Sequence, residues 1–111
     1  MTARVAGPLP MTESDLQGAV VDLAGRFGFL VYHTYDSRRS AKGFPDLCMV
    51  HPKSGALIFA ELKSETGRVT VEQDRWLRAL AFRGVAFVWR PEQLRDGSIG
   101  RALHRYSRVV L

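Results

Sequence analysis

The sequence contains a single cysteine and no long apolar run, and both absences restrict the class of protein. Cys48 has no second cysteine to pair with, so the chain forms no intrachain disulfide and carries no CxxC zinc motif. No apolar stretch approaches the roughly 18 residues of a membrane-spanning helix. The start, residues 1–4, leads into no apolar signal segment, so we expect an intracellular protein.

Lysine is also scarce, although the chain is strongly basic. The net charge is +5, and among 16 basic residues only Lys42, Lys53 and Lys63 are lysines, so arginine supplies the rest. The planar guanidinium suits phosphate oxygens, which favours an anionic or phosphate-bearing partner over a merely solvated basic surface. A length of 111 residues with 46% hydrophobic residues indicates one folded domain with a real core.

Apolar periodicity and turn residues predict a single domain over residues 12–111, preceded by a flexible arm over residues 1–11. Thr12 and Asp15 form a capping-box pattern ahead of an apolar helical stripe that ends near Gly28. We expect strands over residues 29–34, 46–51, 56–63 and 85–90, a helix over 70–83, and a short helix over 98–106. Helix 70–83 is expected to be capped by Thr70 and Gln73 and to bury Trp76, Leu77, Leu80 and Ala81, and Trp89 is expected in the core.

This element order, αβββαβα, predicts a mixed sheet flanked by helices. The second and third strands form an antiparallel hairpin, and the third and fourth form a parallel pair joined by a right-handed helical crossover. The third strand is nearly continuous in apolar residues, which places it at the centre of the sheet.

The hairpin turn at residues 52–55 sets a register. If the turn is centred between Lys53 and Ser54, Asp46 lies directly opposite Glu61. Lys63 then shares their face, because it is two residues beyond Glu61. A slip of one residue would move the strand's side chains to the other face and separate the three groups.

Two opposed carboxylates repel each other, and a hard divalent cation between them would turn that repulsion into a binding site. Lys63 beside them suits the positioning of water or the neutralisation of charge on phosphoryl oxygens. Two simpler interpretations stay open: Asp46 as a turn residue after Pro45, and Glu61 with Lys63 as an ordinary ion pair on a sheet face.

Three motifs together resemble the PD-(D/E)xK nuclease superfamily, most closely its VRR-NUC branch of virus-type replication-repair nucleases, which occur as stand-alone phage proteins. They are Gly43-Phe44-Pro45-Asp46, Glu61-Leu62-Lys63 and Gln73-Asp74-Arg75-Trp76-Leu77. The resemblance runs from about Glu13 to Arg90. It implies an α/β fold with a restriction-endonuclease-like αβββαβ core, a mixed central sheet flanked by helices, to which this chain adds a C-terminal helix.

The resemblance also implies an activity, namely Mg²⁺-dependent DNA endonuclease cleavage with Mn²⁺ able to substitute, and a structure-selective substrate such as branched or Holliday-junction DNA. A role in DNA repair, a homodimer, and a location in the cytoplasm of a bacterium or phage-infected host follow from the same resemblance. The apolar C-terminal residues, among them Ile99 and Leu103, would either contribute to the dimer contact or pack on their own sheet. Alternative functions are a DNA-binding module of this fold without robust catalysis, a nuclease acting on RNA, and a phosphate-binding phage structural protein.

The resemblance assigns roles to individual residues. The catalytic set is Asp46, Glu61, Lys63 and Gln73, and the metal ligands are Glu13, Asp46, Glu61 and the carbonyl of Leu62. Glu13 has the alternative role of stabilising a helix N-terminus, and Gln73 that of completing a capping box. The predicted nucleic-acid contacts are Arg38, Arg39 and Lys42 in the basic loop before Asp46, and Arg68.

Overall fold

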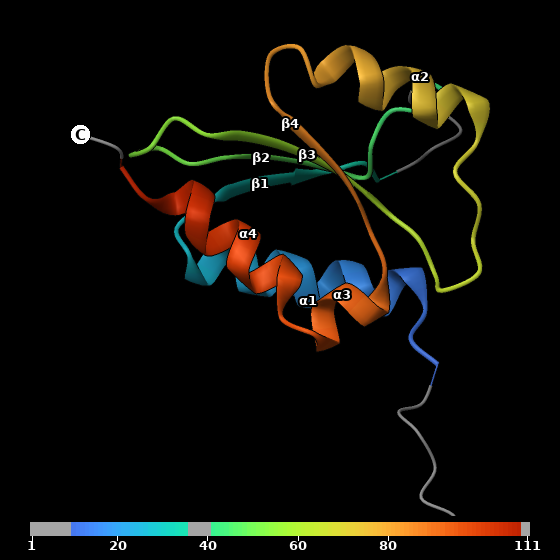
Figure 1. Ribbon diagram of the computed structural model, residues 1–111, viewed down its shortest axis with the longest axis horizontal. Helices are drawn as coiled ribbons and strands as arrows, with labels where there is room; N and C mark the ends of the chain where they lie inside the picture. The colour runs from blue at the N-terminus through green and yellow to red at the C-terminus, as the bar shows by residue number, and fades with distance from the viewer. Residues whose placement is uncertain (1–9, 36–40, 110–111) are drawn as a thin grey trace, which may run out of the picture.

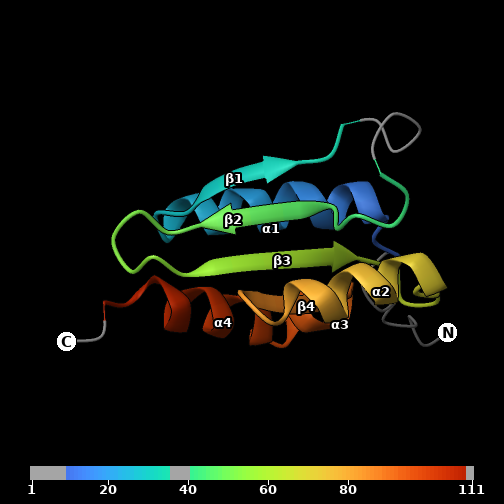
Figure 2. The ribbon, with the colours of Figure 1, turned by 90° about the horizontal axis from the view of Figure 1, so that it is seen from above.

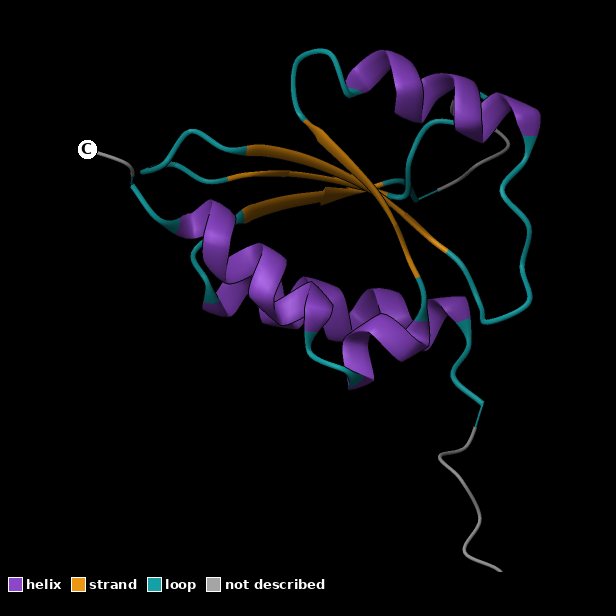
Figure 3. Ribbon diagram, viewed as in Figure 1, coloured by secondary structure: helices purple, strands orange, loops and turns teal. Residues whose placement is uncertain are grey.

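The computed structural model describes residues 10–35 and 41–109, and these form an α/β domain (Figures 1 and 3). The elements are α1 (Glu13–Arg26), β1 (Leu30–His33), β2 (Leu47–Val50), β3 (Leu57–Leu62), α2 (Val71–Leu80), β4 (Val85–Trp89), α3 (Pro91–Arg95) and α4 (Ser98–Ser107). All seven predicted elements are present. The short helix α3 was not predicted, because Pro91 was interpreted only as the end of a strand, whereas proline also suits the first position of a helix.

The four strands form one mixed sheet in the order β1-β2-β3-β4. β1 with β2 and β2 with β3 are antiparallel, and β3 with β4 is parallel, so the predicted hairpin and parallel pair are confirmed. Helices α1, α3 and α4 cover one face, and α2 lies on the opposite face over the β3–β4 side (Figures 1 and 2). The predicted central position of β3 is therefore correct.

The register of the β2–β3 hairpin is the one that the turn predicts. Leu47 pairs with Ala60, and Val50 pairs with Leu57 beside the turn. Asp46 and Glu61 are the next residues along each strand and continue this register. The side chains of Leu47, Ala60 and Leu62 are buried on the α1 side of the sheet, so Asp46 and Glu61 belong to the α2 side.

The core lies between the sheet and the α1–α4 layer. The predicted capping box of Thr12 and Asp15 starts α1, whose buried residues are Leu16, Val20 and Ala24. Ile99 and Leu103 of α4 are also fully buried, which confirms that they pack on their own sheet. Because the C-terminal helix completes this core, these two residues are not available for a dimer contact.

The prediction for the buried face of α2 was only partly correct. Leu77 is buried, but Trp76 is half-buried and Ala81 is exposed, whereas Trp89 in β4 is in the core as predicted. Leu80 is half-buried as well, so Leu77 is the one residue of α2 that is fully buried, and the buried face is narrower than the periodicity suggests. The arm predicted over residues 1–11 falls almost wholly on residues 1–9, outside the described residues, and Met11 packs against the core.

None of the helices within the described ranges is both long enough and apolar enough to cross a membrane.

Candidate active site

Asp46 is held where β1 ends, β2 begins and β3 ends. The Thr34 backbone N–H donates to the Asp46 carbonyl at 3.0 Å, and the Thr34 hydroxyl donates to the Pro45 carbonyl at 3.2 Å. The Leu62 N–H donates to Asp46 Oδ2 at 2.8 Å. This contact across the strand end explains why an aspartate, whose side chain is short, occupies the position: its carboxylate reaches the backbone of β3 while remaining beside Glu61.

The segment before Asp46 is pressed against α2 at a glycine. Gly43 has a φ of 89°, and a Cβ at this position would lie 2.6 Å from the carbonyl carbon of Glu72. Only glycine accepts both the left-handed backbone and this close approach. The Trp76 indole N–H donates to the Lys42 carbonyl at 3.1 Å, which ties the same segment to α2 one turn further along the helix.

Glu61 and Lys63 are charged residues with almost no solvent exposure. Their relative exposures are 2% and 9%, and Lys63 Nζ lies 3.8 Å from Glu61 Oε2. Glu61 Oε1 is buried without a hydrogen-bond partner among the described residues. Burial, and then the neighbouring Asp46 carboxylate, raise the pKa of Glu61 to about 8, although Lys63 opposes the shift. The site therefore holds a buried acid whose negative charge Lys63 compensates only in part.

The raised pKa makes stability pH-dependent in the metal-free protein. The unfolded chain ionises Glu61 near its ordinary value of 4.5 and the folded chain near 8, so stability falls as pH rises between these values. We expect Glu61→Gln to remove this loss and to be more stable than wild type at pH 9 in EDTA, with a much smaller difference at pH 5. Thermal melts at the two pH values test this.

The control for this experiment is Asp22→Asn, which changes an exposed carboxylate on α1 that pairs with Arg26 at 2.9 Å. It should give the same small difference at both pH values. If the stability of Glu61→Gln relative to wild type does not grow with pH, the buried Glu61 carboxylate does not destabilise the folded protein.

Two hollows meet at Asp46. The larger, which we call the site hollow, has a volume of about 650 Å³ and is lined by Thr34, Tyr35, Ala41, Lys42, Gly43, Phe44, Asp46, Glu61, Thr70 and Gln73. The smaller, the α1 hollow, measures about 160 Å³ and is lined by Glu13, Ser14, Gln17, Asp46 and Leu62. Six of the predicted site residues thus border one or the other hollow, and Lys63 lies beside Glu61.

The donor set at this point fits a small hard cation. Within residues 10–35 and 41–109, no group of three or more His, Cys, Asp or Glu side chains is placed to hold a metal. Two carboxylates, one with an orphaned oxygen, are nevertheless what Mg²⁺ accepts, since it usually keeps several waters and binds one or two protein carboxylates. A third side-chain ligand is not required for that ion.

Glu13 and Gln73 each have a structural contact and a place in a hollow. Glu13 Oε1 accepts from the Ser64 N–H at 3.4 Å, just beyond Lys63. Gln73 Oε1 accepts from the Thr70 N–H at 2.8 Å, so the predicted capping box is present. The capping role of Gln73 occupies its side-chain oxygen, and its residue still lines the site hollow.

Of the four basic residues predicted to contact nucleic acid, the structure places one at the site hollow. Lys42 lines the site hollow and forms an ion pair with Glu72 at 3.4 Å. Arg68 is exposed in the loop between β3 and α2 and borders neither hollow. Arg38 and Arg39 lie outside the described residues.

Arg90 is a residue of the site that the sequence did not reveal. Its Nη1 donates to the carbonyls of Ser64 at 2.6 Å and Gly67 at 2.7 Å, across 26 and 23 residues of sequence. It thereby holds the loop that follows Lys63 against the end of β4. Only the position of Arg90 directly after a strand that pairs with β3 could have suggested this contact.

At one strand end of a mixed sheet, Asp46 faces the buried Glu61, with Lys63 beside it, which is the arrangement expected of a nuclease-type α/β domain. The model of the VRR-NUC domain family matches residues 13–90, and the chain belongs to this family. Two solved structures are similar to it. A "VRR_NUC domain protein" has a TM-score of 0.62 at 20% identity, covering 84% of this chain and 86% of that one. A "VRR_NUC domain" has a TM-score of 0.53 at 26% identity, covering 78% and 95%.

Among curated proteins, the chain is similar to the Fanconi-associated nuclease 1 homolog of Schizosaccharomyces pombe. The two are 36% identical over 47 residues, which is 42% of this chain. The match spans only 7% of that relative's length. The match therefore supports the nuclease class of this domain. It covers too little of the relative to bear on the rest of that protein.

Proposed function

We propose that this protein is a metal-dependent endonuclease that hydrolyses phosphodiester bonds in DNA. The observation that carries the proposal is the buried Glu61 side chain facing Asp46, with one oxygen that lacks a hydrogen-bond partner among the described residues and with the Lys63 ammonium 3.8 Å from the other oxygen. Nearly all buried side-chain oxygens in proteins have a hydrogen-bond partner, and a purely structural ion pair gives no reason for one that has none. A cation placed between the two carboxylates accounts for the orphaned oxygen and for the presence of both acids.

In this proposal each residue of the site has its own role. Asp46 and Glu61 hold Mg²⁺ or Mn²⁺ together with the Leu62 carbonyl, and Glu13 supports them from the α1 hollow. When bound, the cation supplies Lewis-acid polarisation of a phosphoryl oxygen and lowers the pKa of its water. Lys63 orients the attacking water or neutralises charge that develops on the phosphoryl oxygens. Gln73, which also lines the site hollow, orients the scissile phosphate through its side-chain amide N–H groups.

DNA is the favoured substrate for two reasons. The net charge of +5 suits a polyanion, and the chain's motifs resemble those of replication-repair nucleases, which favours a DNA substrate of branched structure. An RNA substrate is the second candidate, since the described residues include no contact that selects against a 2′-hydroxyl. A binding module without catalysis is disfavoured because Asp46, Glu61 and Lys63 are all present and adjacent.

A cleavage assay tests the proposal directly. End-labelled single-stranded, duplex, flap and four-way DNA substrates, with an RNA strand of matched sequence, are incubated with the protein in Mg²⁺, in Mn²⁺ and in EDTA. We expect cleavage of at least one branched DNA in either metal and none in EDTA, because the two carboxylates need the cation to act. Cleavage that persists in EDTA, or cleavage of RNA alone, would overturn the proposal.

Assembly is a separate part of the proposal. One domain with a single carboxylate pair cuts one strand at a time, so paired cuts in a four-way junction require two copies related by a two-fold axis. We expect light scattering to report a protein mass of about twice the 12.4 kDa chain mass, either for the protein alone or after the mass of bound junction DNA is subtracted. A monomer under both conditions that nicks one strand would exclude junction resolution and leave the nuclease proposal standing.

A further inference from the structure

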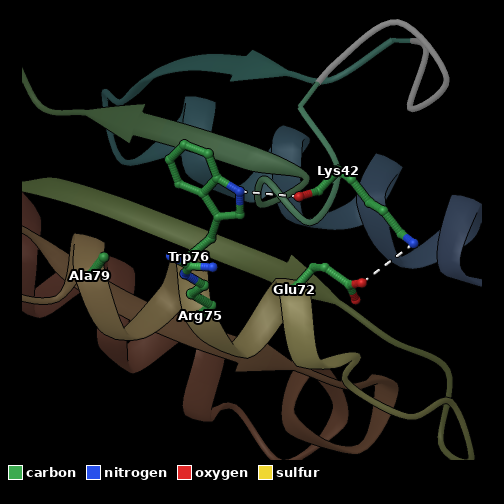
Figure 4. A pocket seen from close by; sticks show the side chains of 5 residues that line it. All are labelled: Lys42, Glu72, Arg75, Trp76 and Ala79. Carbon is green, nitrogen blue, oxygen red and sulfur yellow. Dashed lines mark hydrogen bonds and ion pairs between the residues drawn. The ribbon is translucent and has the colours of Figure 1, made fainter.

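A third hollow lies beside the site hollow on the surface of α2. It measures about 360 Å³ and is lined by Lys42, Glu72, Arg75, Trp76 and Ala79 (Figure 4). Lys42 lines both hollows, so the two are contiguous along the wall formed by α2. We call this the Trp76 hollow. Small-ligand pockets measure roughly 300–1,000 Å³, so the volume of the Trp76 hollow lies at the lower end of that range.

The aromatic wall of this hollow is held in place. The Trp76 indole N–H donates to the Lys42 carbonyl at 3.1 Å, and the Phe44 ring meets the indole edge-to-face with centroids 5.1 Å apart. The indole is therefore fixed by partners on its polar edge and at its side, although it is only half-buried. Ala79, one turn further along α2, is small and leaves the space beside the ring open.

The charges in the hollow favour a base over a phosphate inside it. The Glu72 carboxylate forms part of the wall, and its own backbone amide together with Lys42 lowers the pKa of Glu72, so the group is ionised. An ionised carboxylate repels a phosphate but accepts hydrogen bonds from amino groups on a base. Lys42 and Arg75 are both exposed and cationic, which suits the phosphates on either side of that base.

We propose that the Trp76 hollow binds an unpaired nucleobase of the substrate strand, stacked on the Trp76 indole, next to the phosphate held at Asp46 and Glu61. This rests on the proposed function, because it assumes that a nucleic-acid strand enters the site hollow. Lys42 bridges the two hollows and contacts the backbone between them. Such a site would favour branched, frayed or single-stranded DNA over a closed duplex, since an unpaired base enters it at a lower energetic cost.

The test measures binding in EDTA, where no strand is cut. A fluorescent single-stranded DNA oligonucleotide is compared with an abasic oligonucleotide of the same length and phosphate number. Stacking on one aromatic side chain should make the wild-type protein bind the DNA with bases roughly 5- to 100-fold more tightly. We expect Trp76→Phe to keep most of this preference and Trp76→Leu to lose it, although both lose the bond to Lys42.

Two further variants make the result specific. Phe82→Leu makes the same kind of change at an aromatic residue that is 86% exposed beyond the end of α2, and it should keep the full preference. Ala79→Leu fills the hollow while leaving Trp76 in place, so it should lose the preference even if Trp76→Leu does not fold. Thermal melts of each variant serve to check that it is folded.

The outcomes separate this inference from the proposed function. A wild-type protein with equal affinity for both oligonucleotides, or an Ala79→Leu variant that keeps the wild-type preference, overturns the Trp76 hollow as a base site. Either result can occur while wild type still cuts DNA in Mg²⁺. If the wild-type protein cuts no DNA substrate in Mg²⁺ or Mn²⁺, the nuclease proposal is overturned instead.

Discussion

Asp46→Asn is expected to reduce DNA cleavage by roughly a thousandfold or more while leaving the protein folded. The change removes the charge that binds the cation but keeps a side-chain oxygen able to accept the Leu62 N–H, now 2.8 Å from Asp46 Oδ2. Glu61→Gln should have an effect of similar size, and the loss of repulsion between the two acids should raise rather than lower its stability without metal. Initial cleavage rates in saturating Mg²⁺, with melting temperatures in EDTA, provide both measurements.

Lys63→Ala distinguishes metal binding from catalysis. It should retain stabilisation by added Mn²⁺, because both carboxylates remain, but lose most of the cleavage rate. Asp22→Asn, on the surface of α1, is the matched carboxylate control and should cleave at the wild-type rate. An Asp46→Asn enzyme that cleaves as fast as wild type in saturating Mg²⁺ would show that the site has been placed on the wrong residues.

Gly43→Ala is expected to lower stability by about 2–4 kcal/mol and to impair cleavage strongly. The added Cβ would lie 2.6 Å from the Glu72 carbonyl carbon, and the backbone there has a φ of 89°, which alanine adopts only with strain. To relieve the contact, residues 42–46 must move away from α2, and Asp46 moves with them. Denaturant melts and initial cleavage rates measure the two effects.

Gly55→Ala is the control that separates backbone strain from the collision. Gly55 has a φ of 76°, but a Cβ there meets nothing within 4 Å. We expect it to cost only about 1 kcal/mol and to leave cleavage unchanged. Equal losses at the two glycines would mean that the contact with Glu72 contributes nothing to the position of Asp46.

Local sequence patterns were sufficient to predict most of the helices and strands. They also predicted one contact between residues far apart in the chain, the pairing of Asp46 with Glu61. The four-residue turn after β2 is short, so it leaves a single register for the hairpin, and that register places Asp46 opposite Glu61. The capping boxes at Thr12 and Thr70 are likewise local, because each is made by residues three positions apart. Helix α3 was missed because the same Pro91 both ends a strand and suits the start of a helix.

The sequence by itself therefore determined the order of the elements, the hairpin register and the shared face of Asp46, Glu61 and Lys63, since short-range geometry decides each of them. Only the tertiary structure decided how α2 lies over the sheet. That position buries Leu77 but leaves Trp76 half-buried, brings Glu72 onto Gly43, and opens two contiguous hollows. The contact of Arg90 with the loop after Lys63 depends in the same way on β4 pairing with β3. These features join residues far apart in the chain, and no local periodicity encodes the packing angle that brings them together.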